Sequence, residues 1–320
     1  MPPMPVDCVI GVDLGGTKLL AGVVDADLAV HHRAFRPAPT SNVLDALEAI
    51  ARELIQTADA PVSAVGVGIP SLMDTDRRTA RWTNHLDLEG VAVGDLLSER
   101  LGLPVTVDND ANVAMLAEHR AGVARDALHA VMLTLGTGIG GAMVLGGRLV
   151  RGSRGAAGEW GHVTVDADGP PCHGHCPGHG CLETMASGVA LAREGERFAV
   201  EQPDSALGRE HAAGRPINGA LVTELAHDGD EAAIAAVGVV GRWLGVGLAS
   251  IANALDPEVI VIGGGVIAGG DLLLEPARTE LRARALPPVA DQVRVEAARF
   301  GAESGMLGAA LLARSGALDG

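Results

Sequence analysis

The sequence contains no tyrosine and few other aromatic residues, so its core must be built from aliphatic side chains. Three phenylalanines and three tryptophans are spread over 320 residues, while apolar residues make up 48% of the chain. With 20% charged residues, this composition is typical of a globular protein and not of a disordered one. The length suits two domains, each large enough for a core of its own.

Lysine is also scarce, and acidic residues outnumber basic ones. The formal net charge is −16, and Lys18 is the one lysine in the sequence. We do not expect so acidic a chain to bind nucleic acid or anionic membranes. An anionic substrate is not excluded, because glycine-rich loops and magnesium can hold phosphate locally. We find no apolar run of membrane-spanning length and no secretory signal, so we expect a cytoplasmic protein.

Cysteine is rare as well, and three of the four cysteines lie in one stretch, residues 158–183. The thiol and imidazole groups of this stretch belong to Cys172, Cys176, Cys181, His162, His173, His175 and His179. Thiolate and imidazole are the ligands that zinc prefers, and four of them close a tetrahedral structural site. The alternatives are a disulfide with one free thiol, or three unrelated cysteines. We predict structural zinc, and the residues alone leave open which histidine completes the site.

A glycine turn lies between two apolar runs near the N-terminus. Residues 7–13 and 19–25 predict buried strands, and Gly15, Gly16, Thr17 and Lys18 lie between them. The exposed N–H groups of such a turn can form a concavity for phosphate oxygens, to which the threonine and lysine side chains add donors. Asp13, at the end of the first strand, is placed to hold magnesium. The alternative is an ordinary hairpin turn.

Two later segments repeat this pattern of a strand followed by glycine. The strand predicted over residues 130–134 runs into GTGIGGA, and the strand over 257–262 runs into three glycines. The first of these glycine segments is followed by a strand, whereas a dinucleotide fingerprint needs a helix there. We therefore reject a Rossmann site. Two glycine hairpins instead suggest a duplicated fold, with the two turns facing each other across a cleft.

Strands and helices alternate through the rest of the chain. We predict strands over 64–70 and 104–107, and helices over 42–58, 88–102, 113–122, 184–199, 230–255 and 301–314. Asn42 is the expected N-cap of the first helix. Residues 82–86 are expected in a loop, and residues 204–229 are polar and expected to be less regular.

Asp110 stands where a strand stops and a helix starts. In open α/β sheets, ligands bind outside the carboxyl ends of the strands. Its carboxylate is therefore a candidate general base for a hydroxyl group, with N-capping of the following helix as the alternative.

The order and spacing of several motifs make nearly the whole chain resemble the ROK family of bacterial sugar kinases and repressors. The motifs are Asp13-Leu-Gly-Gly-Thr-Lys18, Asn109-Asp110-Ala-Asn112, Glu159-Trp-Gly-His162 and Gly180-Cys181-Leu-Glu183, together with GGGV and GAESGMLGAA. The resemblance implies an α/β protein with the actin-like ATPase (ribonuclease H-like) fold, in which two α/β domains surround a cleft. We expect a small domain over 1–112, completed by the C-terminal helix 301–320, and a large domain over 113–300 that carries the zinc segment.

The resemblance also implies an ATP-dependent kinase that phosphorylates the 6-hydroxyl of a hexose, with glucose as the expected hexose and Asp110 as general base. It further implies a homodimer or higher homo-oligomer as the assembly. The positions that match sugar ligands are Asn84, Asn109, Asp110, Glu159, His162 and Glu183. Those expected to hold ATP are Asp13, Gly15, Gly16, Thr17, Lys18, Gly136, Thr137, Gly138, Gly264 and Gly265, with Asp13 also the magnesium candidate. The implied zinc ligands are His162, Cys172, Cys176 and Cys181.

The sequence departs from the family pattern at one place. Two extra residues separate Cys172 from Cys176, so the geometry of the zinc site is the point to check. Other hexoses (fructose, mannose or an N-acetylhexosamine), or polyphosphate as donor, are alternatives to glucose and ATP. A sugar-responsive repressor or a sugar-binding protein without catalysis are alternatives of another class. The acidic charge and the few residues ahead of the first strand disfavour a repressor.

Overall fold

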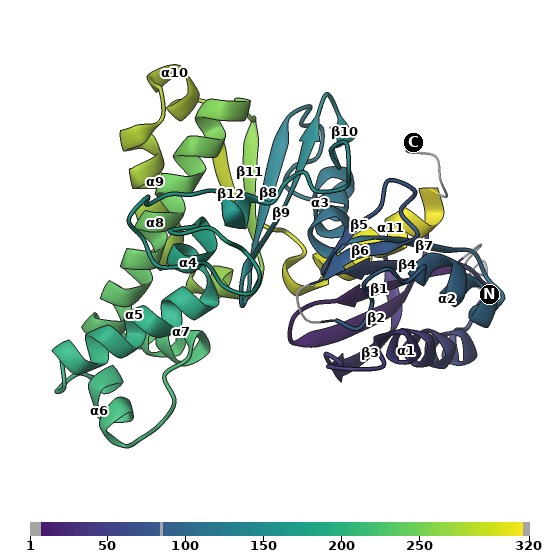
Figure 1. Cartoon of the computed structure of the whole chain (residues 1–320), viewed down its shortest axis with the longest axis horizontal. Coiled ribbons are helices and arrows are strands. Elements are labelled where there is room, and N and C mark those ends of the chain that lie inside the picture. Colours follow the sequence, from purple (N-terminus) through teal and green to yellow (C-terminus); the bar gives the residue numbers. More distant parts are fainter. Residues whose placement is uncertain (1–7, 84–85, 316–320) are drawn as a thin grey trace. The chain divides into compact units, whose positions relative to one another are not determined.

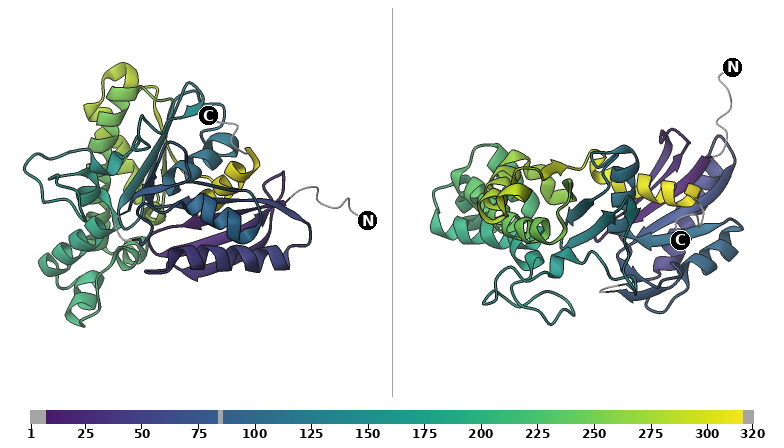
Figure 2. Two further views of the ribbon diagram at one scale, coloured as in Figure 1. Left: turned by 45° about the vertical axis from the view of Figure 1, so that its right-hand side comes forward. Right: turned by 90° about the horizontal axis from the view of Figure 1, so that it is seen from above.

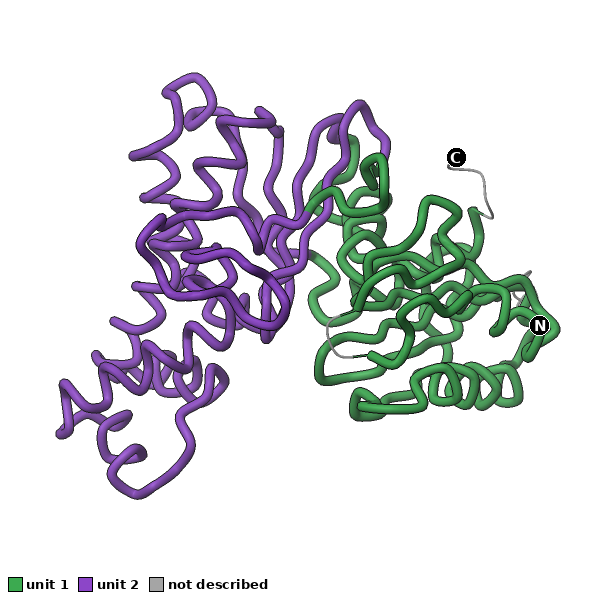
Figure 3. The backbone as a smooth tube through the Cα atoms, viewed as in Figure 1, with its two compact units in different colours: residues 1–126, 149–158, 299–320 green, residues 127–148, 159–298 purple. Residues whose placement is uncertain are grey.

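The computed structural model describes residues 8–83 and 86–315, which form two compact units (Figure 3). Unit 1 comprises residues 1–126, 149–158 and 299–320, and unit 2 comprises residues 127–148 and 159–298. The boundary that we expected at residue 112 falls inside helix α3 (Asp110–Ala121), and unit 1 continues to Asp126. Unit 1 also takes in a short internal segment, 149–158, which no sequence pattern indicated.

Unit 1 is built on a five-stranded sheet in the order β3-β2-β1-β4-β7 (Figure 1). Its strands are β1 (Cys8–Leu14), β2 (Lys18–Val24), β3 (Val30–Pro37), β4 (Val62–Ile69) and β7 (Val105–Asn109). β1 and β2 form an antiparallel hairpin, as predicted, and β4 and β7 extend the sheet in parallel. We did not predict β3 from the sequence, because Ala34 is the one fully buried residue of this edge strand.

Helices cover both faces of this sheet, so every residue of β1 is buried. Ile10 packs into the core beneath α1 (Val43–Thr57). On the other face lies α11 (Ser304–Ser315), drawn in yellow beside the strands in both views of Figure 2. A Cβ on Gly11 or Gly66 would lie 2.0 or 1.8 Å from a carbonyl oxygen of this helix. The two glycines therefore allow the C-terminal helix to dock on the sheet.

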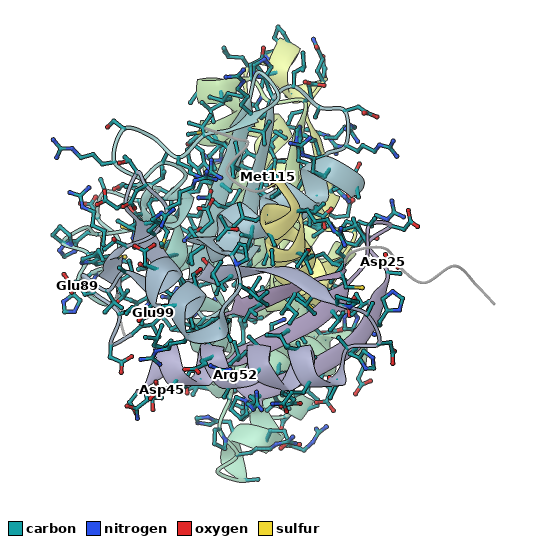
Figure 4. The ribbon with its side chains drawn as sticks, turned by 90° about the vertical axis from the view of Figure 1, so that its right-hand side faces the viewer. Asp25, Asp45, Arg52, Glu89, Glu99 and Met115 are labelled. Carbon is teal, nitrogen blue, oxygen red and sulfur yellow. The ribbon has the colours of Figure 1, made fainter. Side chains whose placement is uncertain are left out.

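The first turn of α1 is capped by Asp87 and not, as predicted, by Asn42. Asn42 occupies the N-cap position with a left-handed backbone, φ 53°, and its side chain makes no capping hydrogen bond. The Asp87 carboxylate instead accepts hydrogen bonds from the backbone N–H groups of Asn42 (2.7 Å) and Val43 (3.2 Å). A distant acid thus replaces the local cap. The solvent-facing side of α1 carries Asp45 and Arg52 (Figure 4).

A short hairpin replaces part of the loop expected over residues 82–86. Trp82 and Thr83 belong to β6 (Ala80–Thr83), which pairs with β5 (Ser71–Met73). The loop prediction was therefore wrong for these two residues. Asn84 and the residue after it lie outside the described residues.

Helix α2 (Val93–Leu101) ends where predicted but begins later. Gly102 closes it in a left-handed conformation, φ 68°. The residues before it were expected to be helical, but they form a turn in which Val91 pairs with Ala80 of β6. A β-bridge to a neighbouring strand has overridden the local helical pattern.

Unit 2 repeats the plan of unit 1, with a sheet in the order β10-β9-β8-β11-β12. Its strands are β8 (Ala130–Leu135), β9 (Ile139–Leu145), β10 (Arg148–Leu149), β11 (Val259–Gly263) and β12 (Arg294–Ala297). β8 and β9 form an antiparallel hairpin, and β11 and β12 extend the sheet in parallel. The matching strand orders agree with the duplication that the two glycine hairpins suggested.

The longest helix of unit 2 is α8 (Glu231–Leu255), as predicted. By length and composition it could cross a membrane, contrary to the expectation that no apolar run reaches that length. Its most apolar stretch is 56% buried, and residues such as Val240 and Leu244 lie in the core of unit 2. The buried core helix of a globular protein can have the same length and composition, so α8 is only weak evidence for a membrane span.

Short helices surround α8, and two sequence predictions fail among them. The helices are α4 (Leu182–Ala186), α5 (Gly188–Glu201), α6 (Ala206–Ala212), α7 (Gly219–His227), α9 (Asp271–Arg284) and α10 (Pro287–Ala290). The helix predicted over 184–199 is broken at Ser187, whose hydroxyl caps α5. Residues 204–229, expected to be less regular, contain two regular helices, α6 and α7, which are capped by Ser205 and Asn218.

Candidate functional site

The candidate base Asp110 is the first residue of α3, directly after β7. Asn109 caps this helix, because its Oδ1 accepts hydrogen bonds from the backbone N–H groups of Ala111 (2.9 Å) and Asn112 (3.1 Å). Its Nδ2 donates to the carbonyl oxygen of Ser71 at 3.3 Å. Asn109 therefore occupies the N-cap position, and Asp110 shares only the Ala111 N–H, which also donates to its Oδ1 at 2.9 Å.

Two aspartates of unit 1 hold their protons unusually tightly. Burial raises the pKa of Asp110 from 3.8 to about 6, against the lowering effect of hydrogen bonds from Ala111 and Asn109. Burial first, and the negative charge of Asp110 second, raise the pKa of Asp13 to about 7. The positive charge of Lys18 opposes that rise. Groups whose pKa lies near neutrality suit proton transfer, and a cation beside them would favour their ionised forms.

The β1–β2 turn carries the first set of predicted phosphate ligands. It closes through a hydrogen bond from the Gly15 N–H to the carbonyl oxygen of Lys18 at 2.8 Å. The Lys18 Nζ donates to the carbonyl oxygen of Ala302 at 2.8 Å, so the turn is tied to the segment ahead of α11. Gly16 and Thr17 complete the turn. A Cβ on Gly15 would meet nothing nearer than 3.8 Å, so the fold itself does not require glycine there.

The Asp13 carboxyl group lies against the start of α11. A Cβ on Gly305 would lie 2.4 Å from the carboxyl carbon of Asp13. Helix N-termini favour negative charge. From the sequence we predicted the GAESGMLGAA stretch only as a helix that fits a family pattern, and we missed that Gly305 makes room for the Asp13 carboxyl group. A glycine in the first turn of a helix could have indicated this close contact, because glycine there weakens the helix unless packing requires it.

The corresponding turn of unit 2 is held by Glu183. The turn closes through the Gly136 N–H and the carbonyl oxygen of Gly138 at 2.8 Å, with Thr137 between them. Glu183 Oε2 accepts a hydrogen bond from the Ile139 N–H at 2.8 Å, and a Cβ on Gly138 would lie 2.2 Å from that oxygen. The structure thus places a predicted sugar ligand against a predicted ATP-binding turn within one unit.

The third glycine segment packs against the strand that leads into this turn. Gly264 has a left-handed backbone, φ 84°, and its Cβ would lie 2.3 Å from the carbonyl oxygen of Leu135. Gly265 begins a 3-10 helix, and apart from the adjoining residues of its own segment no atom of the described residues lies within 4 Å of its Cβ position. The backbone at this position is accessible to a ligand.

His162, Cys172, Cys176 and Cys181 come together in unit 2. Their ligand atoms all lie within 4.8 Å of one another, and His162 Nδ1 lies 3.5 Å from Cys172 Sγ. Zn–S and Zn–N bonds of about 2.3 and about 2.0 Å in a tetrahedron place sulfur and nitrogen about 3.5 Å apart. The two extra residues after Cys172 therefore do not prevent the geometry. Of the histidines in residues 158–183, the cluster contains His162 and not His173, His175 or His179.

The chemistry of these groups also fits a metal ion. Burial and the two neighbouring thiols raise the pKa of Cys172 to about 12, and burial raises that of Cys181. Three thiols so placed cannot easily ionise without a cation among them. The other ring nitrogen of His162, Nε2, lies 4.0 Å from Glu159 Oε2. One imidazole thus faces both the thiols and a predicted sugar ligand.

The model of the ROK family matches residues 9–315. A glucokinase of Streptomyces coelicolor is 35% identical over 314 residues, covering 95% of this chain and 97% of that protein. A putative xylose repressor of a Caldicellulosiruptor species is 28% identical over 313 residues, covering 95% of this chain and 77% of that protein.

Among solved structures, a ROK family glucokinase from Streptomyces griseus in complex with glucose and AMPPNP has a TM-score of 0.88 at 36% identity. The match covers 97% of this chain and all of that one. These findings confirm the family resemblance and the α/β, actin-like ATPase fold that it implied. The chain belongs to the ROK family.

Proposed function

We propose that this chain is an ATP-dependent kinase that transfers a phosphoryl group to the 6-hydroxyl of a hexose, with glucose as the leading substrate. The observation that carries the proposal is Asp110, an aspartate at the end of a strand whose capping role is taken by Asn109 and whose pKa is raised to about 6. Such a group is ionised at neutral pH yet basic enough to take a proton from a hydroxyl. The similarity to glucokinases supports the sugar and the donor.

In this proposal Asp110 accepts the proton of the 6-hydroxyl as its oxygen attacks phosphorus. Asn109, Glu159, His162 and Glu183, with Asn84, hold the other hydroxyls, since carboxylates and amides can bind vicinal diols in pairs. In such a transfer the protein forms no covalent bond of its own; it positions the hydroxyl and the phosphate and neutralises the charge that develops on the phosphate oxygens.

The glycine turns are the proposed contacts for ATP, through the backbone N–H groups of Gly15 and Gly16, of Gly136 to Gly138, and of Gly264 and Gly265. Thr17 and Lys18 would add side-chain donors. Asp13 is the residue that would hold magnesium, directly or through water. When bound, magnesium neutralises charge on the phosphate oxygens. Its positive charge would also keep Asp13 ionised despite the raised pKa of that group.

Zinc is proposed as a structural ion held by His162, Cys172, Cys176 and Cys181. It would fix the ends of the glycine-rich stretch and thereby the position of Glu183, two residues after the last cysteine. Free thiols of this kind suit a reducing compartment, and we propose the cytoplasm. A homodimer is the assembly that we expect.

A transcriptional regulator is the second candidate, because the matched relatives include a putative xylose repressor. The net charge of −16 disfavours DNA binding by this chain. A kinase and a sugar-binding regulator differ in a simple assay. 6-Deoxyglucose, which lacks the reacting hydroxyl, should compete with glucose for binding to a kinase without being phosphorylated, and glucose should yield the 6-phosphate by phosphorus NMR. Binding of glucose without any phosphorylated product would refute the kinase proposal.

A further inference from the structure

The segment 149–158 belongs to unit 1, although it lies between two stretches of unit 2. It is tied to unit 1 by an ion pair between Arg151 and Asp108. The Arg151 Nε and Nη2 both donate to Asp108 Oδ2 at 2.7 Å. The Asp108 side chain is 1% exposed and the Arg151 side chain 20% exposed. A carboxylate buried to this degree needs a compensating positive charge, and the Arg151 guanidinium provides it.

Asp108 immediately precedes the two residues at the end of β7 that matter for the proposed chemistry. Its other oxygen, Oδ1, accepts hydrogen bonds from the Asn109 N–H at 2.8 Å and from Asn112 Nδ2 at 3.0 Å. One carboxylate therefore holds the backbone directly before Asp110 and a side chain in the first turn of α3. Both oxygens are engaged, and the arginine balances the charge of the whole group.

The same segment is anchored at other points in unit 1. Arg81 Nη1 donates to the carbonyl oxygen of Arg154 at 3.4 Å. Gly155 has a left-handed backbone, φ 75°, and its Cβ would lie 1.9 Å from the carbonyl oxygen of Met73. The chain then continues into Glu159, a proposed sugar ligand. Arg151 thus belongs to a segment held in place at three points.

We propose that Arg151 is a positioning residue for phosphoryl transfer, which acts through Asp108 to fix Asn109 and Asp110 at the end of β7. The inference rests on the proposed kinase function. Proton transfer depends on the base lying within hydrogen-bond reach of the hydroxyl, so small displacements lower the rate steeply. Asn109, at this strand end, is one proposed sugar ligand, but Glu159, His162 and Glu183 belong to unit 2, so most of the proposed sugar contacts do not depend on this strand end. Loss of the arginine should therefore affect turnover more than binding.

The test compares four variants of the full chain for kcat, for glucose affinity by calorimetry, and for zinc content. Arg151→Met removes the charge but keeps an extended apolar side chain, and it should lower kcat at least tenfold with a glucose Kd within about threefold. Arg151→Lys restores the charge without the fork of donors and should recover part of the loss. Arg154→Met is the matched control, an exposed arginine of the same segment, and should leave kcat unchanged.

The fourth variant, Arg151→Met with Asp108→Asn, distinguishes the loss of the ion pair from a general loss of folded structure. It removes the uncompensated buried charge together with its partner, so kcat should recover several-fold over Arg151→Met alone. If Arg151→Met does not fold, this double variant and Arg151→Lys carry the test. An unchanged kcat in Arg151→Met, equal losses in kcat and affinity, or no recovery in the double variant would each overturn the inference. Wild-type protein that phosphorylates no sugar would instead refute the proposed function itself.

Discussion

Replacing Asp110 with asparagine should lower turnover strongly and, at the same time, stabilise the folded protein by an amount that grows as the pH rises from about 4 through about 6. The change keeps the shape of the side chain but removes both the proton acceptor and the half-buried negative charge. Loss of a general base lowers turnover by about 10²–10⁴-fold. Sugar binding should persist, because the amide still offers hydrogen bonds to a hydroxyl.

The magnitude of the stabilisation follows from the pKa of the carboxyl group. It rises from 3.8 to about 6 in the folded protein, a difference that corresponds to about 3 kcal/mol. Because the folded value is the higher one, the stability associated with this group is fully present below about pH 4. It is lost as the pH rises through about 6. The stability advantage of the variant should therefore be about 3 kcal/mol at pH 8 and about half as large at pH 5.

Thermal unfolding at these two pH values, with the metal content kept constant, measures the effect. For a chain of this length, about 3 kcal/mol corresponds to a rise in Tm of roughly 4–5 °C. Asp27→Asn, which removes a carboxylate from an exposed turn, is the control and should change neither Tm nor turnover. Near-normal turnover in the Asp110 variant would refute the assignment of the base. A stability gain that is the same at both pH values would refute the burial argument.

Three further outcomes are expected. The pH profile of kcat/KM should have an acid limb near pH 6, because the candidate base must lose its proton before it can accept one, and a flat profile between pH 5 and 7 would contradict this. Cys176→Ser should lower both zinc content and glucose affinity, whereas Cys8→Ser, on a buried strand outside the thiol cluster, should keep its zinc. Gly305→Ala should lower the free energy of unfolding by about 1–3 kcal/mol and reduce turnover, because its methyl group would meet the Asp13 carboxyl group. Gly238→Ala is the control: its methyl group has space in α8, so unfolding and activity measurements should show no loss or a slight gain in stability.

The sequence was a good guide where a pattern is local. Apolar runs bounded by glycine identified β1, β2, β4, β8 and β11, and helical periodicity identified α1, α3 and α8. The spacing of cysteines, with the family resemblance, indicated the cluster that the structure assembles around His162. Each of these patterns lies within a short stretch of chain, so it can be recognised without knowledge of the fold.

The sequence was a poor guide where distant segments decide the local structure. The cap of α1 comes from Asp87, far along the chain, and not from the adjacent Asn42. The role of Gly305 depends on Asp13, which meets it only after folding. The ion pair of Arg151 with Asp108 spans 43 positions and leaves no periodic pattern. Contacts of this kind depend on how distant segments pack against one another in the folded protein. A single sequence does not show which distant segments will meet.

The most direct test of the account is the release of ADP from Mg-ATP by purified protein over a panel of sugars. Glucose, mannose, fructose and N-acetylglucosamine would be compared in a coupled assay, with Asp110→Asn protein as the blank. The account predicts turnover with glucose well above that with the other sugars, and none in the variant. Turnover with another hexose would keep the mechanism and change the substrate. No turnover with any sugar, alongside measurable sugar binding, would contradict the central claim that this chain is a kinase.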